Sequence, residues 1–181
     1  MKKIKPNYKW VITITTAAFF ISLIVGTLTK VFVDDVAMAV AFLILLVVIL
    51  LGIIFDVLGL AVATCTEVPF HAKLTKGQKE YKEAITLIRN AEKVSSFCND
   101  VVGDIAGVIS GGLAGSIVLN MVNKYEGLNS LALDLLLTAL VAAITVGGKA
   151  YGKSFAINQS QLIVEKTSKL IYFFKKLLPR K

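Results

Sequence analysis

Cysteine and histidine are scarce in this chain of 181 residues, which has two cysteines and one histidine. Cys65, Cys98 and His71 match no zinc-ligand spacing, so we expect no structural zinc site. Both cysteines lie near the ends of apolar runs that the charge pattern places toward a reducing cytoplasm, so no structural disulfide is expected. We expect the two thiols to be small buried side chains.

The chain also lacks a long linker, a low-complexity tract and an internal repeat, which predicts a single membrane domain over residues 1–181. No A-x-A-like cleavage site follows the first apolar run, so this run is expected to be a retained anchor rather than a signal peptide. The net charge is +8, but no recognised nucleic-acid motif accompanies it. We therefore expect no nucleic-acid partner.

Apolar residues dominate the composition, at 56% of the chain with a mean hydropathy of +0.75. They form four runs, at residues 10–33, 36 to about 63, 94–121 and 131–148. Each run is near or above the roughly 20 residues that a membrane-spanning helix needs. The sequence therefore predicts an all-α integral membrane protein with four transmembrane helices.

Basic residues are distributed unevenly around these runs. Of the 20 lysines and arginines, 18 flank the amino terminus, the connection between the second and third runs, and the carboxyl-terminal tail. The two short opposite loops hold Asp34, Asp35 and Glu126. Because cytoplasmic segments are enriched in Lys and Arg, we expect a multi-pass protein of the cell membrane with both termini in the cytoplasm. The positive charge also suits a lipid membrane with anionic headgroups as partner.

Two polar segments show apolar residues at helical spacing. In residues 66–93, apolar side chains from Tyr81 to Ile88 share one face after Pro69. In the tail, apolar side chains from Ile163 to Leu177 form one stripe, with lysines on the other side. Both segments are predicted to be cytoplasmic amphipathic helices at the membrane surface or against the bundle.

Acidic residues occur inside the apolar runs, where charged groups are costly and usually functional. Asp56 lies in the second run, and Asp100 and Asp104 lie four residues apart in the third. At about 1.5 Å per residue, Asp100 and Asp104 would lie roughly 9 and 15 Å from Val94, stacked on one helix face. Glycines at positions 103, 107, 111 and 115 run beside them and are expected to permit close helix packing.

Oxygen-bearing side chains near these carboxylates suggest a pocket for a divalent cation, because hard cations prefer carboxylate, hydroxyl and amide oxygens. The predicted metal ligands are Thr64, Thr66, Asn99, Asp100, Asp104 and Asp56. The alternative is that these groups only hold the helices together, through hydrogen bonds and pairing with lysine.

Three short motifs resemble, in the same order, those of the CorB/CorC and cyclin M magnesium-transporter membrane domain. ATCTEVPF at 63–70 is similar to the family's S-x-S-E-T-A signature, and NAEKVSS at 90–96 is similar to N-P-E-R-L-L-S. GKAYGKSFA at 148–156 is similar to G-E-I-x-P-K-x-x-A, and Asn99 with Asp100 falls near the family's Asn-rich turn. The resemblance covers roughly residues 50–170.

The resemblance implies that residues 36–181 form a transporter-like membrane domain, preceded by an extra transmembrane helix in residues 1–35. It implies a homodimer that binds or transports a dehydrated magnesium ion, with Thr64 and Thr66 in place of the signature serines. A stand-alone domain is expected, without the family's nucleotide-sensing CBS pair. The family's glutamate falls on Lys149, whose ammonium group would repel magnesium or pair with an aspartate.

Two other functions are consistent with the sequence. A non-transporting accessory subunit would explain Lys149, since a Lys and Asp pair could neutralise the ion site. Alternatively, FD at 55–56 and VGD at 102–104 resemble faintly the aspartates of intramembrane aspartyl proteases, in which two carboxylates share a proton. Val101 breaks the fuller G-x-G-D pattern of that class. We therefore expect a divalent-cation protein rather than an enzyme, with magnesium as the favoured ion.

Overall fold

The computed structural model describes residues 8–34, 37–75, 77–125, 127 and 129–177. Every regular element within these ranges is helical, which confirms the all-α prediction. Several charged residues that carry the predicted orientation lie outside the described residues, namely Lys2, Lys3, Lys5, Asp35, Lys76, Glu126, Arg180 and Lys181.

Four helices in the described part of the chain are long and apolar enough to cross a membrane: Tyr8–Leu28, Met38–Thr64, Ala91–Lys124 and Ser130–Asn158. Each overlaps one of the four apolar runs of the sequence. The third begins before Val94, and the fourth continues past Gly148. The number of span-length helices in the described ranges therefore agrees with the prediction.

The helices fall into two compact units, of which unit 1 comprises residues 1–51 and 104–145. It holds α1 (Tyr8–Asp34), the first half of α2 (Met38–Thr64), α6 (Asp104–Lys124) and the first part of α7 (Ser130–Asn158). Gly127 lies between α6 and α7 with a φ of 90°, a conformation that favours glycine. Asn129 Oδ1 caps α7 by accepting a hydrogen bond from the Ala132 amide at 3.1 Å.

In unit 1, α1 packs against α6, which carries a row of buried residues from Ile105 to Val118. None of the described side chains of α1 is buried. Long apolar side chains on this helix, such as Ile12 and Phe19, are 66% and 63% exposed. Apolar surface of this extent is typical of a helix that contacts a membrane or a partner.

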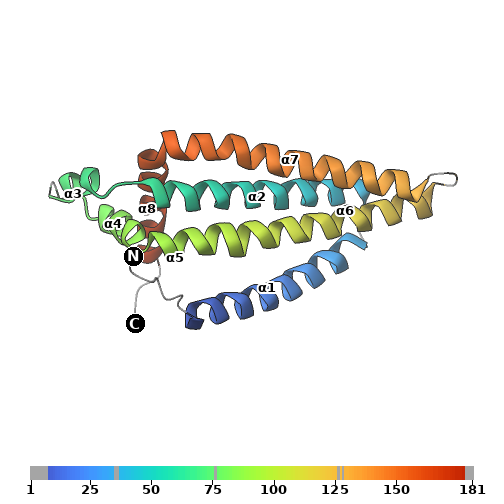
Figure 1. The fold of residues 1–181 in the computed structure, drawn as a ribbon, viewed down its shortest axis with the longest axis horizontal. Helices are drawn as coiled ribbons and strands as arrows, with labels where there is room; N and C mark the ends of the chain where they lie inside the picture. Colours follow the sequence, from blue (N-terminus) through green and yellow to red (C-terminus); the bar gives the residue numbers. More distant parts are fainter. Residues whose placement is uncertain (1–7, 35–36, 76, 126, 128, 178–181) are drawn as a thin grey trace, which may run out of the picture. The chain divides into compact units, whose positions relative to one another are not determined.

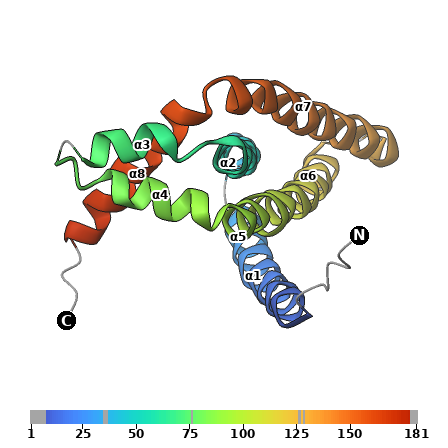
Figure 2. The ribbon, with the colours of Figure 1, turned by 60° about the vertical axis from the view of Figure 1, so that its left-hand side comes forward.

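Unit 2 comprises residues 52–103 and 146–181, and includes the second halves of α2 and α7. Its other elements are α3 (Val68–Leu74), α4 (Tyr81–Arg89), α5 (Ala91–Ser96), η1 (Phe97–Gly103) and α8 (Ser160–Leu177). α4 packs against both α3 and α8, and Figure 2 shows the three helices side by side. α8 runs across the direction of α7 rather than continuing it (Figure 1).

The amphipathic segment predicted in residues 66–93 is divided into short helices, because turn residues interrupt it. Pro69 lies in the first turn of α3, where its missing N–H is tolerated. Gly77 follows α3 with a φ of 83°, and Asn90 separates α4 from α5 with a φ of −106°. The face predicted around Tyr81 is nevertheless buried. Its core residues are Val62, Phe70, Tyr81, Ala84, Ile85 and Val164.

Candidate functional site

Asp56 lies in the part of α2 that belongs to unit 2, and it is only 5% exposed. The Lys149 ammonium of α7 lies 3.8 Å from Asp56 Oδ1. This distance is beyond hydrogen-bonding range, so the two groups form an ion pair without a direct hydrogen bond. Asp56 Oδ2 is buried and has no hydrogen-bond partner. Pairing with an aspartate was one of the two outcomes expected for Lys149, and it is observed.

Glycines bring α2 and α7 into close contact on either side of Asp56. A Cβ atom on Gly152 would lie 2.5 Å from Val57 Cγ2, and one on Gly148 would collide with Ile53. Only glycine therefore fits at these two positions without a shift of the facing side chains of α2. Both glycines belong to the motif at 148–156, but the sequence predicted close packing for the glycines of the third run instead.

The end of η1 completes the surroundings of Lys149. A Cβ atom on Gly103 would lie 3.5 Å from Lys149 Nζ and 3.9 Å from the carbonyl oxygen of Gly52. Gly103 is the first glycine of the stripe predicted to permit close packing. Asp56 and Lys149 are thus enclosed where α2, η1 and α7 meet, and we call these surroundings the Asp56 site.

Asn99 of η1 lies against Gly59 of α2, since a Cβ atom on Gly59 would collide with the Asn99 amide group. Asn99 Nδ2 donates a hydrogen bond to Ser95 Oγ at 3.4 Å, whereas Asn99 Oδ1 is buried without a partner. Residues three apart share a helix face, so Asp56 and Gly59 face the same side of α2. Two buried oxygens without hydrogen-bond partners, Asp56 Oδ2 and Asn99 Oδ1, therefore lie along one face of α2.

The segment that carries Asn99 and Asp100 is a π-helix of seven residues between α5 and α6. Hydrogen bonding from residue i to residue i+5 widens each turn of the helix. Such segments are rare in proteins as a whole, but they occur often at functional sites. The sequence predicted an ordinary α-helix here, with Asp100 stacked on Asp104. The rule that residues four apart stack on one helix face does not hold through η1, because it assumes hydrogen bonding from residue i to residue i+4.

The other four predicted ligands are exposed: Thr64, Thr66, Asp100 and Asp104. Asp100 is exposed and accepts a hydrogen bond from Ser96 Oγ at 2.5 Å. The Thr64 hydroxyl donates to a main-chain carbonyl one turn earlier at 2.9 Å, and Thr66 is exposed. Asp104 is exposed and opens α6 in unit 1. Among the six predicted ligands, Asp56 and Asn99 therefore each provide one buried side-chain oxygen that has no hydrogen-bond partner.

No group of three or more His, Cys, Asp or Glu side chains within the described ranges could hold a metal ion. A cation at the Asp56 site would have the Asp56 carboxylate as a ligand, with amide or main-chain oxygens and water as further ligands. Magnesium is commonly bound in this way, because it loses its water reluctantly and needs only one or two carboxylates. The donor set fits a partly hydrated magnesium ion if the Lys149 ammonium moves away.

A second group of charged residues, the Glu165 cluster, joins α3, α4 and α8. The Glu165 carboxylate accepts hydrogen bonds from Lys73 Nζ at 2.5 Å, Tyr81 Oη at 2.8 Å and Lys169 Nζ at 2.8 Å. The bonds from Lys169 and Lys73 lower the pKa of Glu165 to about 2. In turn, the hydrogen bond to Glu165 raises the pKa of both lysines. Sequence reasoning missed this cluster, because its members are far apart in the chain.

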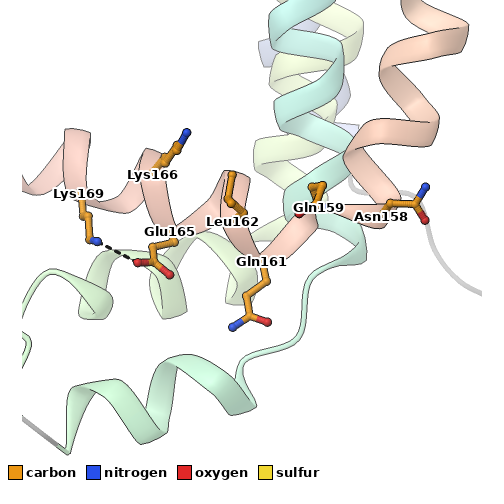
Figure 3. Close-up of a pocket in the computed structure, with 7 residues that line it drawn as sticks. All are labelled: Asn158, Gln159, Gln161, Leu162, Glu165, Lys166 and Lys169. Carbon is orange, nitrogen blue, oxygen red and sulfur yellow. Dashed lines mark hydrogen bonds and ion pairs between the residues drawn. The ribbon is translucent and has the colours of Figure 1, made fainter.

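A hollow of about 410 Å³ lies along the beginning of α8 (Figure 3). Its lining residues are Asn158, Gln159, Gln161, Leu162, Glu165, Lys166 and Lys169. In Figure 3, Leu162 and Lys166 point to the side of α8 on which α2 and α7 extend, whereas Gln161 and Glu165 point to the opposite side. The lining carries two lysines and one glutamate, so the hollow is positively charged.

Comparison of the chain with protein-family models, curated proteins and solved structures found no match. The likeness to the CorB/CorC and cyclin M domain therefore rests on the sequence motifs, and membership of that family stays a prediction.

Proposed function

We propose that this chain is a membrane protein that binds or transports a divalent cation at the Asp56 site, with magnesium as the favoured ion. The observation that supports the proposal is the buried Asp56 Oδ2, which has no hydrogen-bond partner and lies on the same face of α2 as the buried Asn99 Oδ1. Buried polar atoms without partners are uncommon and cost free energy. A bound cation would satisfy oxygens of this kind.

Lys149 is the internal competitor for this cation. A divalent ion and an ammonium group about 4 Å apart repel by roughly 8 kcal/mol at an effective dielectric constant of about 20. That is comparable to the whole binding free energy of a micromolar complex. Magnesium therefore binds only when Lys149 Nζ leaves Asp56. The absence of a direct hydrogen bond between these two groups makes this movement easier.

Magnesium flux in proteoliposomes tests the proposal. Asp56→Asn is expected to reduce flux at least about tenfold, because the carboxylate supplies the main attraction, and each tenfold step corresponds to about 1.4 kcal/mol. Lys149→Gln is expected to raise magnesium affinity by a similar factor. Lys153→Gln is the matched control: it removes the same charge from an exposed position of α7 and should leave the affinity unchanged. Equal flux in the wild type and Asp56→Asn would refute the proposal.

A second candidate is a non-transporting accessory subunit, and the Lys149 and Asp56 pair is the observation that favours it. In this case Lys149 permanently supplies the charge that a cation would bring. Lys149→Glu distinguishes the two candidates, because it installs the carboxylate that the resembled family has at this position. Magnesium-induced thermal stabilisation in Lys149→Glu but not in the wild type would favour the accessory subunit, as would co-purification of a stoichiometric partner.

We further propose a multi-pass protein of the cell membrane, with both termini in the cytoplasm, that works as a homodimer. A Cβ atom on Gly107, Gly111 or Gly115 of α6 would meet no atom of the described chain within 4 Å. This stripe leaves room for a helix of a second copy. Disulfide cross-linking of Gly111→Cys in native membranes, in a chain without its two natural cysteines, should give a covalent dimer. No more dimer than from Val146→Cys would contradict this.

A further inference from the structure

The two sides of α8 have different surroundings. Val164 and Ser168 are 0% exposed on the side that packs against α4. Away from α4, large apolar side chains remain exposed within the described chain: Leu162 45%, Leu170 56%, Phe173 57%, Phe174 53% and Leu177 67%. These five side chains and Lys166 are called the outer face of α8. A continuous apolar surface of this kind marks a membrane or protein contact.

The direction of the outer face favours the membrane. α8 follows directly after the span-length helix α7 ends at Asn158, and it runs across that helix (Figure 1). Leu162 and Lys166 point to the side on which α2 and α7 extend (Figure 3). Positions 162, 166, 170, 173 and 177 recur every three or four residues, so they form one stripe. An amphipathic helix in this place lies in the plane of the membrane interface.

The charges of α8 favour an acidic lipid. Lys169 and Lys73 compensate Glu165, and Lys175 Nζ binds Glu83 Oε2 at 2.6 Å. Lys166, in contrast, makes no ion pair with any residue that the structure describes. Long basic side chains beside an apolar surface extend their charged ends to the headgroup level. The hollow of about 410 Å³ at this end of α8 provides room for a headgroup.

We propose that the outer face of α8 is embedded in the surface of the bilayer and that Lys166 binds the phosphate of an acidic phospholipid there. The apolar residues of the stripe contact the upper acyl chains. This site does not depend on the Asp56 site, so Asp56→Asn should leave lipid binding unchanged.

Quenching of tryptophan fluorescence by brominated lipids tests the proposal on the full chain. The reporter is Phe174→Trp in a Trp10→Phe background, reconstituted in phosphatidylcholine vesicles that contain some phosphatidylglycerol. Bromine is placed on the acyl chains of one lipid or the other. Brominated phosphatidylglycerol should quench more strongly per molecule than brominated phosphatidylcholine. Leu170→Trp serves as a second reporter in case the first perturbs folding.

Lys166→Gln should lower this lipid preference by about fivefold, the factor for loss of one lysine near an anionic surface. Lys82→Gln is the matched control, because it removes the same charge from an exposed position of α4. Equal quenching by the two lipids would overturn the proposal, as would an absence of quenching, which would indicate that a second copy or water covers the face. An equal loss in both lysine variants would overturn the assignment to Lys166.

Discussion

Glu165 and Asp56 are both acidic residues of unit 2, but their surroundings differ. Glu165 accepts three hydrogen bonds of 2.8 Å or less, and its pKa is about 2. Asp56 is more deeply buried, yet it has one ammonium group at 3.8 Å and one oxygen without a hydrogen-bond partner. A carboxylate whose bonding capacity is filled holds helices together. One with unused capacity in a buried place can still take up a ligand.

The largest effect on stability is expected from Asp56→Asn, which removes the buried carboxylate that pairs with the Lys149 ammonium. We expect a loss of about 3 kcal/mol in the free energy of unfolding in detergent, as for other broken buried ion pairs. Adding Lys149→Gln should recover most of this loss, because both charges of the pair are then removed. If the double variant is as unstable as Asp56→Asn alone, the pair does not determine the stability of this region.

Glu165→Gln should cost somewhat less, about 2 kcal/mol, because it weakens charge-assisted hydrogen bonds in a half-buried place. α8 should then separate from α4 more readily, which faster proteolysis of the tail would report. Glu92→Gln on α5 is the matched control, and its expected effect is within about 0.5 kcal/mol. If Glu165→Gln and Glu92→Gln lower the free energy of unfolding equally, the Glu165 cluster does not hold α8 against α4.

Gly152→Ala tests whether the Asp56 site depends on the close approach of α2 and α7. The new Cβ atom would lie 2.5 Å from Val57 Cγ2, and overpacking of this kind costs about 1–2 kcal/mol. Gly26→Ala, at an open position of α1, should instead be neutral or stabilise this helix by up to about 1 kcal/mol through helix propensity. Thermal unfolding of both glycine variants measures these two effects. Equal shifts would argue against a packing constraint at Gly152.

Acid is expected to weaken the Glu165 cluster to a similar extent as Glu165→Gln. Because the pKa of Glu165 is lowered from 4.5 to about 2, its contribution to stability is present above about pH 5 and is lost as the pH falls toward 2. Because the pKa values of Lys73 and Lys169 are raised, the stability that these two lysines contribute is lost only as the pH rises to strongly alkaline values. The melting temperature should therefore fall below about pH 5, and this fall should be smaller in Glu165→Gln. An unchanged acid dependence would exclude Glu165 as its source.

Much of the fold could be predicted from the sequence, because hydrophobic length and helical periodicity are local properties. Four long apolar runs correspond to four span-length helices, and the face around Tyr81 is buried as its spacing indicates. The breaks within residues 66–93 were not predicted, although Gly77 and Asn90 provided the signal. The π-helix of η1 has no comparable signature, because the same residues also suit an α-helix.

The site could be predicted only in part. The sequence identified Asp56 and Asn99 as polar residues inside apolar runs and proposed that Lys149 could pair with an aspartate. It did not show which aspartate, because that depends on how α2 and α7 pack. The glycines that set this packing, Gly148 and Gly152, are recognised only when the side chains opposite them are known.

The core of α3, α4 and α8 also has a consequence for the order of folding during synthesis. Phe70 and Tyr81 are made early, but Val164, which completes their core, and Glu165, which binds the Tyr81 hydroxyl, follow only after all four span-length helices. Until then, the apolar side of α4 has no cover from α8. A segment made after the four described span-length helices is thus the one that closes this part of the molecule.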